Sequence, residues 1–313
     1  MTELRFERRV AVVTGAGRGI GRAYALLLAE RGASLVVNDL GASMEGVGST
    51  SEVAASVARE IVAAGGAAIA DVSDVATVEG ADSLITAAVD RFGRLDVLIN
   101  NAGIIKWGGF PQVDAENLAR HLAVHVSGSF NTTRAAWPHM VERAYGRIVM
   151  TTSAGLFGLP QNTSYATAKG GVIGLTRSAA TAGAAHGIKV NLIAPAATTR
   201  MAGGPARADG SPGAGSVEMP PAAVAPMAAF LAHEDCPVNG EIYTAGAGRF
   251  ARIFIGSTNG YVHPTPDPTV EVVAENWERI NDESGYFVPG DLLAWSTAFM
   301  AHLPPGDAGP SAS

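Results

Sequence analysis

The sequence contains a tyrosine and a lysine, Tyr165 and Lys169, that lie four positions apart, and Ser153 precedes the tyrosine by twelve positions. On a helix, the spacing of four places the phenol and the ammonium group on one face. A fixed positive charge beside a phenol favours the phenolate and lowers the phenol pKa. The pair therefore predicts a tyrosine that acts as an acid or a base.

A glycine-rich turn near the start of the chain is the second chemical signal. A short β-branched run over 10–14 leads into Thr-Gly-Ala-Gly-Arg-Gly-Ile-Gly at 14–21, and a helical stretch follows. Glycine lets the backbone approach a pyrophosphate closely, and a helix N-terminus stabilises the negative charge. A turn that serves packing alone is the alternative, but the order of strand, turn and helix favours dinucleotide binding. The predicted cofactor contacts are Gly15, Gly17, Arg18, Gly19, Ile20 and Gly21.

Asp39 is expected to determine whether the protein prefers NAD or NADP. It ends the second predicted strand, eighteen positions after Gly21. A carboxylate there can accept hydrogen bonds from both adenosine ribose hydroxyls and would repel a 2′-phosphate, so we predict NAD rather than NADP. Arg18 complicates this prediction, because a basic residue in the glycine turn can approach a 2′-phosphate; a solvated surface arginine is the alternative.

Two further segments follow predicted strands and are candidates for contacts to the adenosine half of the cofactor. Asp71, with Val72 beside it, closes the third strand and could bind the adenine amino group or cap a helix. Asn100-Asn101-Ala102-Gly103 follows the fourth strand. Small residues there allow backbone contact with the cofactor, while an asparagine side chain can tie neighbouring strands together. We therefore include Asn101, Ala102 and Gly103 among the predicted contacts.

The fold that positions these residues can be predicted from the alternation of two kinds of segment. Short β-branched runs alternate with alanine-rich stretches of helical length, which indicates parallel strands joined by right-handed crossovers. The predicted strands cover 10–14, 34–39, 67–71, 97–100, 147–151, 189–194 and 242–245, and the predicted helices cover 19–31, 49–64, 77–92, 115–143, 164–186 and 221–232. We therefore expect an α/β fold, a Rossmann doubly wound seven-stranded parallel sheet, with the ligand beyond the carboxyl ends of the strands.

The composition restricts the class of protein. Hydrophobic residues make up 47% of the 313 residues and charged residues 16%, which is typical of a globular protein. The formal net charge of −7 and the absence of a basic stripe argue against a nucleic-acid or membrane partner. Cys236 is the only cysteine, so no intrachain disulfide can form, and we expect a cytoplasmic location. We find no signal peptide and no apolar run that could span a bilayer.

Taken together, the motifs resemble the short-chain dehydrogenase/reductase family over roughly residues 5–248. The resemblance rests on the glycine turn at 14–21, Asn-Asn-Ala-Gly at 100–103, Ser153 and the pair Tyr165 and Lys169. Within that family the chain is most similar to the (3R)-hydroxyacyl-CoA dehydrogenase portion of type 2 peroxisomal multifunctional enzymes and their bacterial relatives. This closer similarity rests on the segments 21–25, 37–41, 46–48, 125–130, 132–140 and 146–148.

The resemblance implies a role for each catalytic candidate. Tyr165 would take the substrate hydroxyl proton as a hydride leaves for the nicotinamide, and Ser153 would hold the substrate oxygen. Lys169 would bind the nicotinamide ribose and lower the pKa of Tyr165. The family also implies a homodimer or a homotetramer that acts on a small-molecule substrate.

The segment after the sixth predicted strand departs from the family pattern at two positions, 196 and 200. Pro195 and Thr198 are predicted cofactor contacts, because the resemblance places backbone contacts to the carboxamide after the sixth strand. Ala196 stands where the family has a glycine, and Arg200 where a threonine is common. The individual nicotinamide contacts are therefore left open.

His125 also departs from the family, many members of which have an asparagine at this position. An imidazole could relay protons from the lysine, or it could serve a structural role in a helix kink, and both interpretations stay open. His121 and His125 have the spacing of a helical zinc pair. However, Leu122 replaces the glutamate of metalloproteases and no third ligand is evident, so we predict no metal site.

We predict a catalytic NAD-binding domain over 1–248 and a C-terminal extension over 249–313 that contacts another subunit or covers the site. The segment 202–216, rich in Gly, Ala, Pro and Ser, is expected to be a mobile loop over the site. The expected function is NAD-dependent interconversion of a secondary alcohol and a ketone, with a (3R)-hydroxyacyl-CoA and its 3-oxoacyl-CoA as the first candidate pair. A hydroxysteroid dehydrogenase is the alternative. A non-catalytic dinucleotide-sensing protein would not need Ser153, Tyr165 and Lys169 together.

Overall fold

The chain divides into two compact units, Met1–Ile253 and Phe254–Ser313. The computed structural model describes residues 3–199, 219–265 and 267–303. The predicted mobile loop over 202–216 lies outside the described residues.

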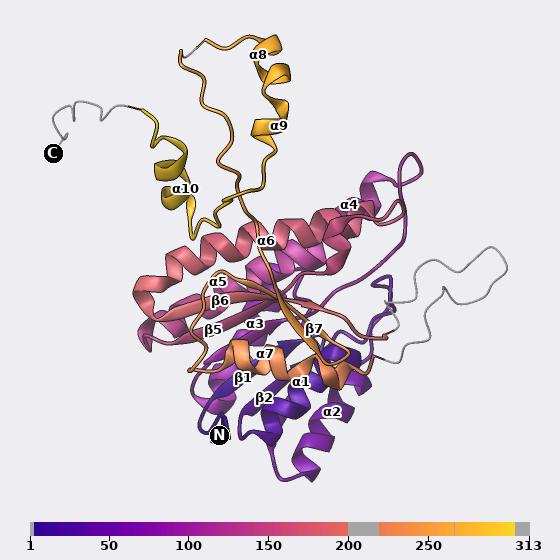
Figure 1. The fold of residues 1–313 in the computed structure, drawn as a ribbon. Helices are drawn as coiled ribbons and strands as arrows, with labels where there is room; N and C mark the ends of the chain where they lie inside the picture. Colours follow the sequence, from indigo (N-terminus) through magenta and orange to yellow (C-terminus); the bar gives the residue numbers. More distant parts are fainter. Residues whose placement is uncertain (1–2, 200–218, 266, 304–313) are drawn as a thin grey trace. The chain divides into compact units, whose positions relative to one another are not determined.

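The first unit is built on an eight-stranded sheet with the order β3-β2-β1-β4-β5-β6-β7-β8 (Figure 1). The strands are β1 Val10–Thr14, β2 Ser34–Asn38, β3 Ala67–Asp71, β4 Val97–Asn100, β5 Gly146–Thr151, β6 Ile188–Pro195, β7 Ile242–Gly246 and β8 Arg249–Ile253. All pairs from β1 to β7 are parallel. The predicted doubly wound fold and its seven strands are confirmed. The strand order reverses between β1 and β4, which is where such folds bind ligands.

The eighth strand was not predicted. β8 runs antiparallel to β7, and the two are joined by Ala247 and Gly248, whose φ angles are 49° and 75°. A two-residue hairpin turn with both φ angles positive is usually signalled by Asn-Gly or Asp-Gly. Here the first position is an alanine, so the sequence lacks this turn motif. The sheet therefore continues to Ile253, five residues beyond the predicted boundary at 248.

Helices cover both faces of the sheet (Figure 1). One layer contains α1 Gly19–Glu30, α2 Glu52–Ala63 and α7 Ala225–Ala232, and the other contains α3 Val78–Phe92, α5 Gly128–Glu142 and α6 Thr163–Gly183. In β1, Ala11 and Val13 join the core of the first layer, while Val10 and Val12 join the core of the second. Both faces of the strand are buried, which explains its uninterrupted apolar sequence.

The long helix predicted over 115–143 is interrupted by a π-helical turn. The chain forms α4 Ala115–His121, the π-helical segment Leu122–Ser127 and then α5. A π-helical turn contains one extra residue per hydrogen-bonded loop and is often found at functional sites. Here it contains His125.

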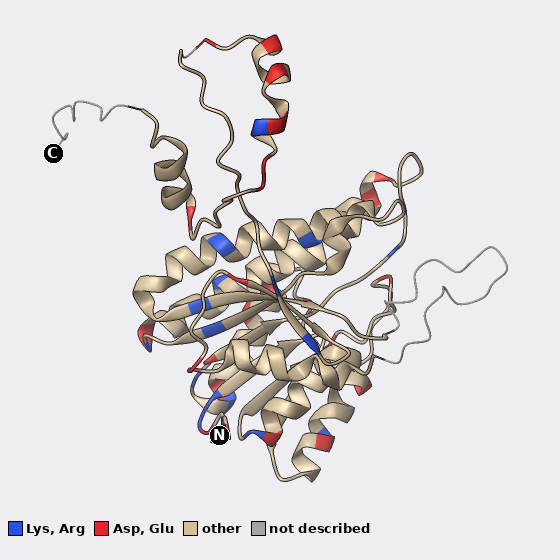
Figure 2. Ribbon diagram, viewed as in Figure 1, with Lys and Arg blue, Asp and Glu red and all other residues tan. Residues whose placement is uncertain are grey.

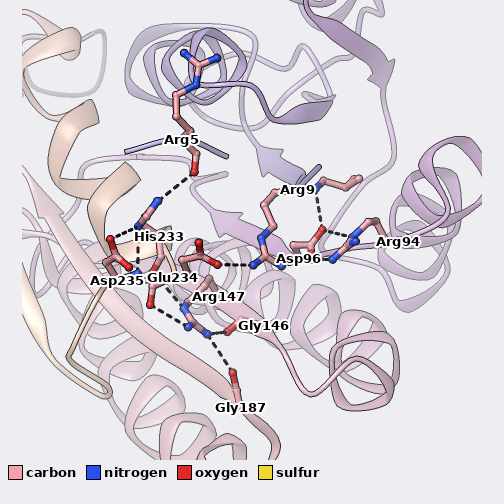
Figure 3. Close-up of polar contacts among 11 residues, drawn as sticks. Arg5, Arg9, Arg94, Asp96, Gly146, Arg147, Gly187, His233, Glu234 and Asp235 are labelled. Atoms are coloured by element: carbon pink, nitrogen blue, oxygen red, sulfur yellow. Dashed lines mark hydrogen bonds and ion pairs between the residues drawn. The ribbon is translucent and has the colours of Figure 1, made fainter. Parts of the chain in front are cut away.

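A buried ionic cluster joins the amino ends of several strands, at the edge opposite the predicted motifs (Figure 3). Asp96 is fully buried and accepts hydrogen bonds from Arg9 Nη1 at 3.3 Å, Arg94 Nε at 2.7 Å and Arg94 Nη2 at 2.6 Å. The ring of Tyr145 contacts the guanidinium groups of Arg9 and Arg147, at 3.8 and 4.4 Å from its centroid. Arg147 also donates to four main-chain carbonyl groups, those of Gly146, Gly187, His233 and Glu234.

The described residues of the second unit form three short helices, α8 Val270–Glu275, α9 Trp277–Ile280 and α10 Leu292–Phe299. Asn276 separates α8 from α9. Glu271 and Glu275 lie on α8, α9 carries Glu278 and Arg279, and charges of both signs are scattered over the first unit (Figure 2). No helix in the described part of the chain is long and apolar enough to cross a membrane.

Candidate active site

The three predicted catalytic side chains converge where β5 and α6 meet. Ser153 follows β5 and begins a 3₁₀ turn, and Tyr165 and Lys169 lie on the first turns of α6. The Ser153 Oγ accepts a hydrogen bond from the Gly155 amide at 3.0 Å. A methyl group added to Gly155 would lie 3.3 Å from both the Ser153 Oγ and the Tyr165 Cε1. The serine and tyrosine side chains therefore face the same point.

Burial dominates the protonation of this group. It raises the pKa of Tyr165, and a hydrogen bond with the Ser153 side chain opposes that rise. Lys169 is 3% exposed, and burial lowers its pKa to about 7. Its Nζ donates to the Thr151 carbonyl oxygen at 2.7 Å and lies 5.6 Å from the centroid of the Tyr165 ring. The sequence analysis expected the ammonium to lower the pKa of Tyr165; in this structure burial dominates and the pKa is raised.

Asn162 is a supporting residue that the sequence analysis missed. It is 3% exposed, and its Oδ1 accepts a hydrogen bond from the Ala166 amide at 3.0 Å, which caps α6. Its Nδ2 donates to the Gly155 carbonyl oxygen at 3.1 Å. One side chain therefore joins the turn after Ser153 to the helix that carries Tyr165. An asparagine just before a helix is an N-cap signal, so the capping of α6 by Asn162 could have been predicted.

His125 lies against the ring of Tyr165, with the two planes at 90° and the centroids 5.4 Å apart. Its Nε2 is 2.8 Å from the Ile104 carbonyl oxygen and 3.3 Å from the Ile104 amide nitrogen. Its Nδ1 is buried and has no hydrogen-bond partner among the described residues. Burial, followed by the charge of Lys169, holds the pKa of His125 well below its ordinary value. The imidazole is therefore neutral near pH 7.

His121 is stacked on His125, with centroids 5.9 Å apart and planes at 13°. Its Nδ1 is 2.8 Å from the Asn117 carbonyl oxygen, and its Nε2 accepts from the Lys106 amide at 3.3 Å. Both histidines thus hold the main chain of 104–106 in place. Within the ranges that the structure describes, no three His, Cys, Asp or Glu side chains come together as metal ligands.

A cavity of about 480 Å³ lies at the carboxyl ends of β1, β2 and β4. Many of the predicted cofactor residues line it: Gly15, Arg18, Gly19, Ile20, Gly21, Asp39, Asn101, Ala102 and Gly103. The segment 42–46 lines it as well, which the sequence analysis did not expect. Val124, the neighbour of His125 in the π-helical turn, also lines the cavity. The cavity therefore extends to the helix that carries His125.

Asp39 connects the glycine turn to the chain after β2. Its Oδ2 accepts from the Gly17 amide at 2.9 Å, and its Oδ1 accepts from the Gly41 amide at 2.7 Å. A methyl group on Gly17 would lie 2.8 Å from that Oδ2 and 2.2 Å from Val53 Cγ1, so a glycine is required there. A carboxylate offers about four acceptor sites. Both oxygens can therefore still accept hydrogen bonds from ribose hydroxyls.

Asp71 does not cap a helix, which was one of its two predicted roles. Its Oδ1 accepts from Asn38 Nδ2 at 2.7 Å and from the Ser73 amide at 2.9 Å, and its Oδ2 accepts from Ser73 Oγ at 3.1 Å. Thr77 caps α3 instead. Asp71 thus ties β2 to β3, while Val72 is 44% exposed beside it.

Asn101 performs the strand-tying role that was predicted for this motif. Its Nδ2 donates to the carbonyl oxygens of Thr14 and Gly15 at 2.9 and 3.1 Å. Pro195 ends β6. Thr198 exchanges two hydrogen bonds with the main chain of Met219, at 2.7 and 3.2 Å. These last two predicted residues lie at the carboxyl edge of the sheet, and Arg200 lies outside the described residues.

Comparison with known proteins gives a consistent result. Residues 9–208 match the family model for short chain dehydrogenases. The chain is 42% identical over 286 residues to a Mycobacterium tuberculosis protein named for the short-chain type dehydrogenases/reductases, covering 91% of this chain and 98% of that protein. It is 42% identical over 290 residues to mouse peroxisomal multifunctional enzyme type 2, covering 91% of this chain and 38% of the mouse enzyme. The chain thus spans less than half the length of the mouse protein.

The solved structures agree with the sequence matches. The crystal structure of a short chain dehydrogenase from Mycobacterium avium superposes with a TM-score of 0.75 at 34% sequence identity. The match covers 88% of this chain and 97% of that structure.

Proposed function

Because this chain belongs to the short-chain dehydrogenase/reductase family, and is therefore an oxidoreductase, we propose that it interconverts a secondary alcohol and a ketone with NAD as hydride acceptor. The observation that supports this most is the convergence of Ser153, Tyr165 and Lys169 next to a cavity lined by the glycine turn. A protein that only senses a dinucleotide has no use for the side chains of Ser153, Tyr165 and Lys169.

The residues around the cavity fit a dinucleotide. A methyl group on Gly15 would lie 2.8 Å from Ala102 Cα, so glycine lets the turn pack against the segment after β4, and both segments line the cavity. The glycine turn and the start of α1 would hold the pyrophosphate, and Asp39 would hold the adenosine ribose. The bound cofactor would supply the hydride acceptor. The carboxylate of Asp39 is the reason that we propose NAD over NADP.

The side chains divide the proton chemistry among them. In the direction of oxidation, Tyr165 takes the hydroxyl proton of the alcohol while the Ser153 hydroxyl holds the same oxygen, and the phenolic proton that Tyr165 gives up in the same step moves on to Lys169. Lys169, whose pKa of about 7 lets it gain and lose a proton near neutral pH, passes the proton onward. His125 would be the next group on the path of the proton. Its imidazole is neutral, and its buried Nδ1 has no hydrogen-bond partner among the described residues. That nitrogen can hold the water through which the proton leaves.

We propose a (3R)-hydroxyacyl-CoA and its 3-oxoacyl-CoA as the substrate pair. The support is the similarity of this chain to mouse peroxisomal multifunctional enzyme type 2 over 91% of its length. A homodimer or homotetramer is part of the same proposal, and light scattering of the purified protein would measure it. The second unit, which exposes apolar side chains such as Leu292 and Leu293 at 76% each, is a candidate for that contact.

The test compares the wild type with Tyr165→Phe, which removes the transferable proton and leaves the ring. We expect turnover of (3R)-hydroxyacyl-CoA esters with NAD, and a loss of about 10²- to 10⁴-fold in kcat for the variant with unchanged NAD affinity. The panel should include (3S)-esters, hydroxysteroids and NADP. Turnover of steroids alone would replace the proposed substrate, and a variant that keeps more than half of the wild-type kcat would refute the mechanism.

A further inference from the structure

One wall of the cofactor cavity is formed by residues 41–48, between β2 and α2, which we call the cofactor loop. Ala42, Ser43, Met44 and Gly46 all line the cavity. The backbone of the loop has positive φ angles at three glycines: 74° at Gly41, 79° at Gly46 and 78° at Gly48. Glycine loses more conformational freedom on ordering than any other residue. The position of this wall therefore depends on the contacts that hold it.

Hydrogen bonds attach the cofactor loop to two neighbouring parts of the first unit. The Ile105 amide donates to the Met44 carbonyl oxygen at 2.9 Å. Arg120 Nη2, from α4, donates to the Glu45 carbonyl oxygen at 2.8 Å and lies 3.4 Å from that of Gly46. The second attachment is made by a side chain, so it can be removed without changing the loop itself.

Arg120 lies on α4, just before the π-helical turn, and its side chain reaches the cofactor loop. It adjoins His121, the last residue of α4, and the π-helical turn with His125 follows directly. A methyl group on Gly46 would lie 3.0 Å from Ile104 Cγ2 and 3.6 Å from Arg120 Nη2, so the loop packs closely against both. The charge of Arg120 also contributes to lowering the pKa of His121, after the larger effect of burial.

We propose that Arg120 is a positioning residue for the dinucleotide. By fixing the Glu45 and Gly46 carbonyl groups, its guanidinium holds the cofactor loop closed over the cavity and so sets the affinity for the dinucleotide. Arg120 does not itself line the cavity, and its effect is transmitted through the loop. A guanidinium suits this task because it is permanently charged and presents several donors in one plane. The inference rests on the proposed dinucleotide-binding function.

The experiment measures dinucleotide binding directly, so it requires no knowledge of the substrate. NADH and NADPH are titrated separately into the wild type, Arg120→Met and Arg120→Lys, with nucleotide fluorescence or calorimetry as the readout. Methionine keeps an unbranched apolar stem and removes the donors, and we expect the Kd of the preferred dinucleotide to rise roughly 3- to 10-fold. Lysine keeps the charge and a donor, so the Kd of Arg120→Lys should lie between those of the wild type and Arg120→Met. With a substrate in hand, kcat at saturating dinucleotide should be unchanged.

Arg143→Met is the matched control. Arg143 Nη2 donates to the Gly93 carbonyl oxygen at 2.8 Å, the same kind of bond at the same length as that from Arg120 to Glu45. Neither Arg143 nor Gly93 lines the cavity. We expect the wild-type Kd for this variant.

The outcomes separate this inference from the proposed function. A folded Arg120→Met protein with the wild-type Kd would overturn the inference, as would an equal loss of affinity in Arg143→Met. If methionine prevents folding, Arg120→Lys decides: a raised Kd at an unchanged melting temperature supports the inference, and an unchanged Kd overturns it. A wild type that binds neither NADH nor NADPH would overturn the proposed function, and the inference with it.

Discussion

Replacing Lys169 by methionine should make the first unit more stable near neutral pH, although it removes a residue proposed to take part in the reaction. Burial lowers the pKa of the lysine from 10.5 to about 7. At about 1.4 kcal/mol for each pH unit between these values, holding the ammonium in the folded protein costs roughly 5 kcal/mol at pH 7 and below. The hydrogen bond from Nζ to the Thr151 carbonyl oxygen offsets about 1.5–3 kcal/mol of that cost. Methionine should therefore raise the free energy of unfolding by roughly 2–3.5 kcal/mol.

The pH dependence of this difference identifies its cause. Above about pH 7 the folded protein holds Lys169 as a neutral amine, whereas the unfolded chain keeps it protonated up to about pH 10.5. The unfolded state then binds one more proton than the folded state. Wild-type stability should accordingly rise by up to about 1.4 kcal/mol per pH unit between these limits, relative to Lys169→Met. Below about pH 7 both states are protonated, and the advantage of methionine should be constant.

Urea unfolding of both proteins between about pH 6 and 9, without added dinucleotide, measures the effect. Lys106→Met is the control, since Lys106 is solvent-exposed, and its stability should run parallel to that of the wild type over this range. The reasoning is refuted if Lys169→Met and the wild type differ by the same free energy at every pH. It is also refuted if the advantage of methionine grows as the pH rises.

Three further substitutions test other parts of the site and the fold. Asp39→Ala should raise the ratio of kcat/KM with NADP to that with NAD, and an unmodified enzyme that already uses both equally would show that Arg18 deserves the larger role. His125→Asn should keep most of the activity because its amide can take the place of Nδ1, the atom proposed to hold the water, whereas His125→Leu has no hydrogen-bonding group and should lose most of kcat; a stable and fully active leucine variant would exclude the relay. Asp96→Ala removes the acceptor of the Arg94 guanidinium and of the Val10 amide, while Arg9 keeps its ion pair with Glu234, and should cost about 1–3 kcal/mol in urea unfolding, with the Kd for NADH unchanged in the folded protein.

Most of the parallel strands could be predicted from the sequence because they are buried on both faces, whereas the edge strand β3 is partly exposed. All five residues of β1 are buried, so the strand is a continuous apolar run between polar turns. The π-helical turn could not be predicted, because one extra residue within a helix does not require a particular residue type. It is stabilised by contacts far away in the sequence, such as those of His125 with the main chain of Ile104.

The same distinction applies to the site. Ser153, Tyr165 and Lys169 could be predicted because the chemistry requires a hydroxyl, a phenol and an amine, and few other side chains supply them. The side chains that hold the site in place bind main-chain groups. Asn162 donates to the Gly155 carbonyl oxygen in the turn after Ser153, and Arg120 donates to the Glu45 carbonyl oxygen in the cofactor loop.

Every residue has a carbonyl group, so the sequence at an accepting position does not reveal that it accepts. The pKa of Tyr165 was predicted in the wrong direction for a related reason, since burial depends on the packing of the whole unit. A site inferred from sequence therefore identifies the reacting groups, while their affinities and protonation depend on side-chain contacts to the main chain. Arg120→Met removes one such contact without changing any residue of the sequence motifs.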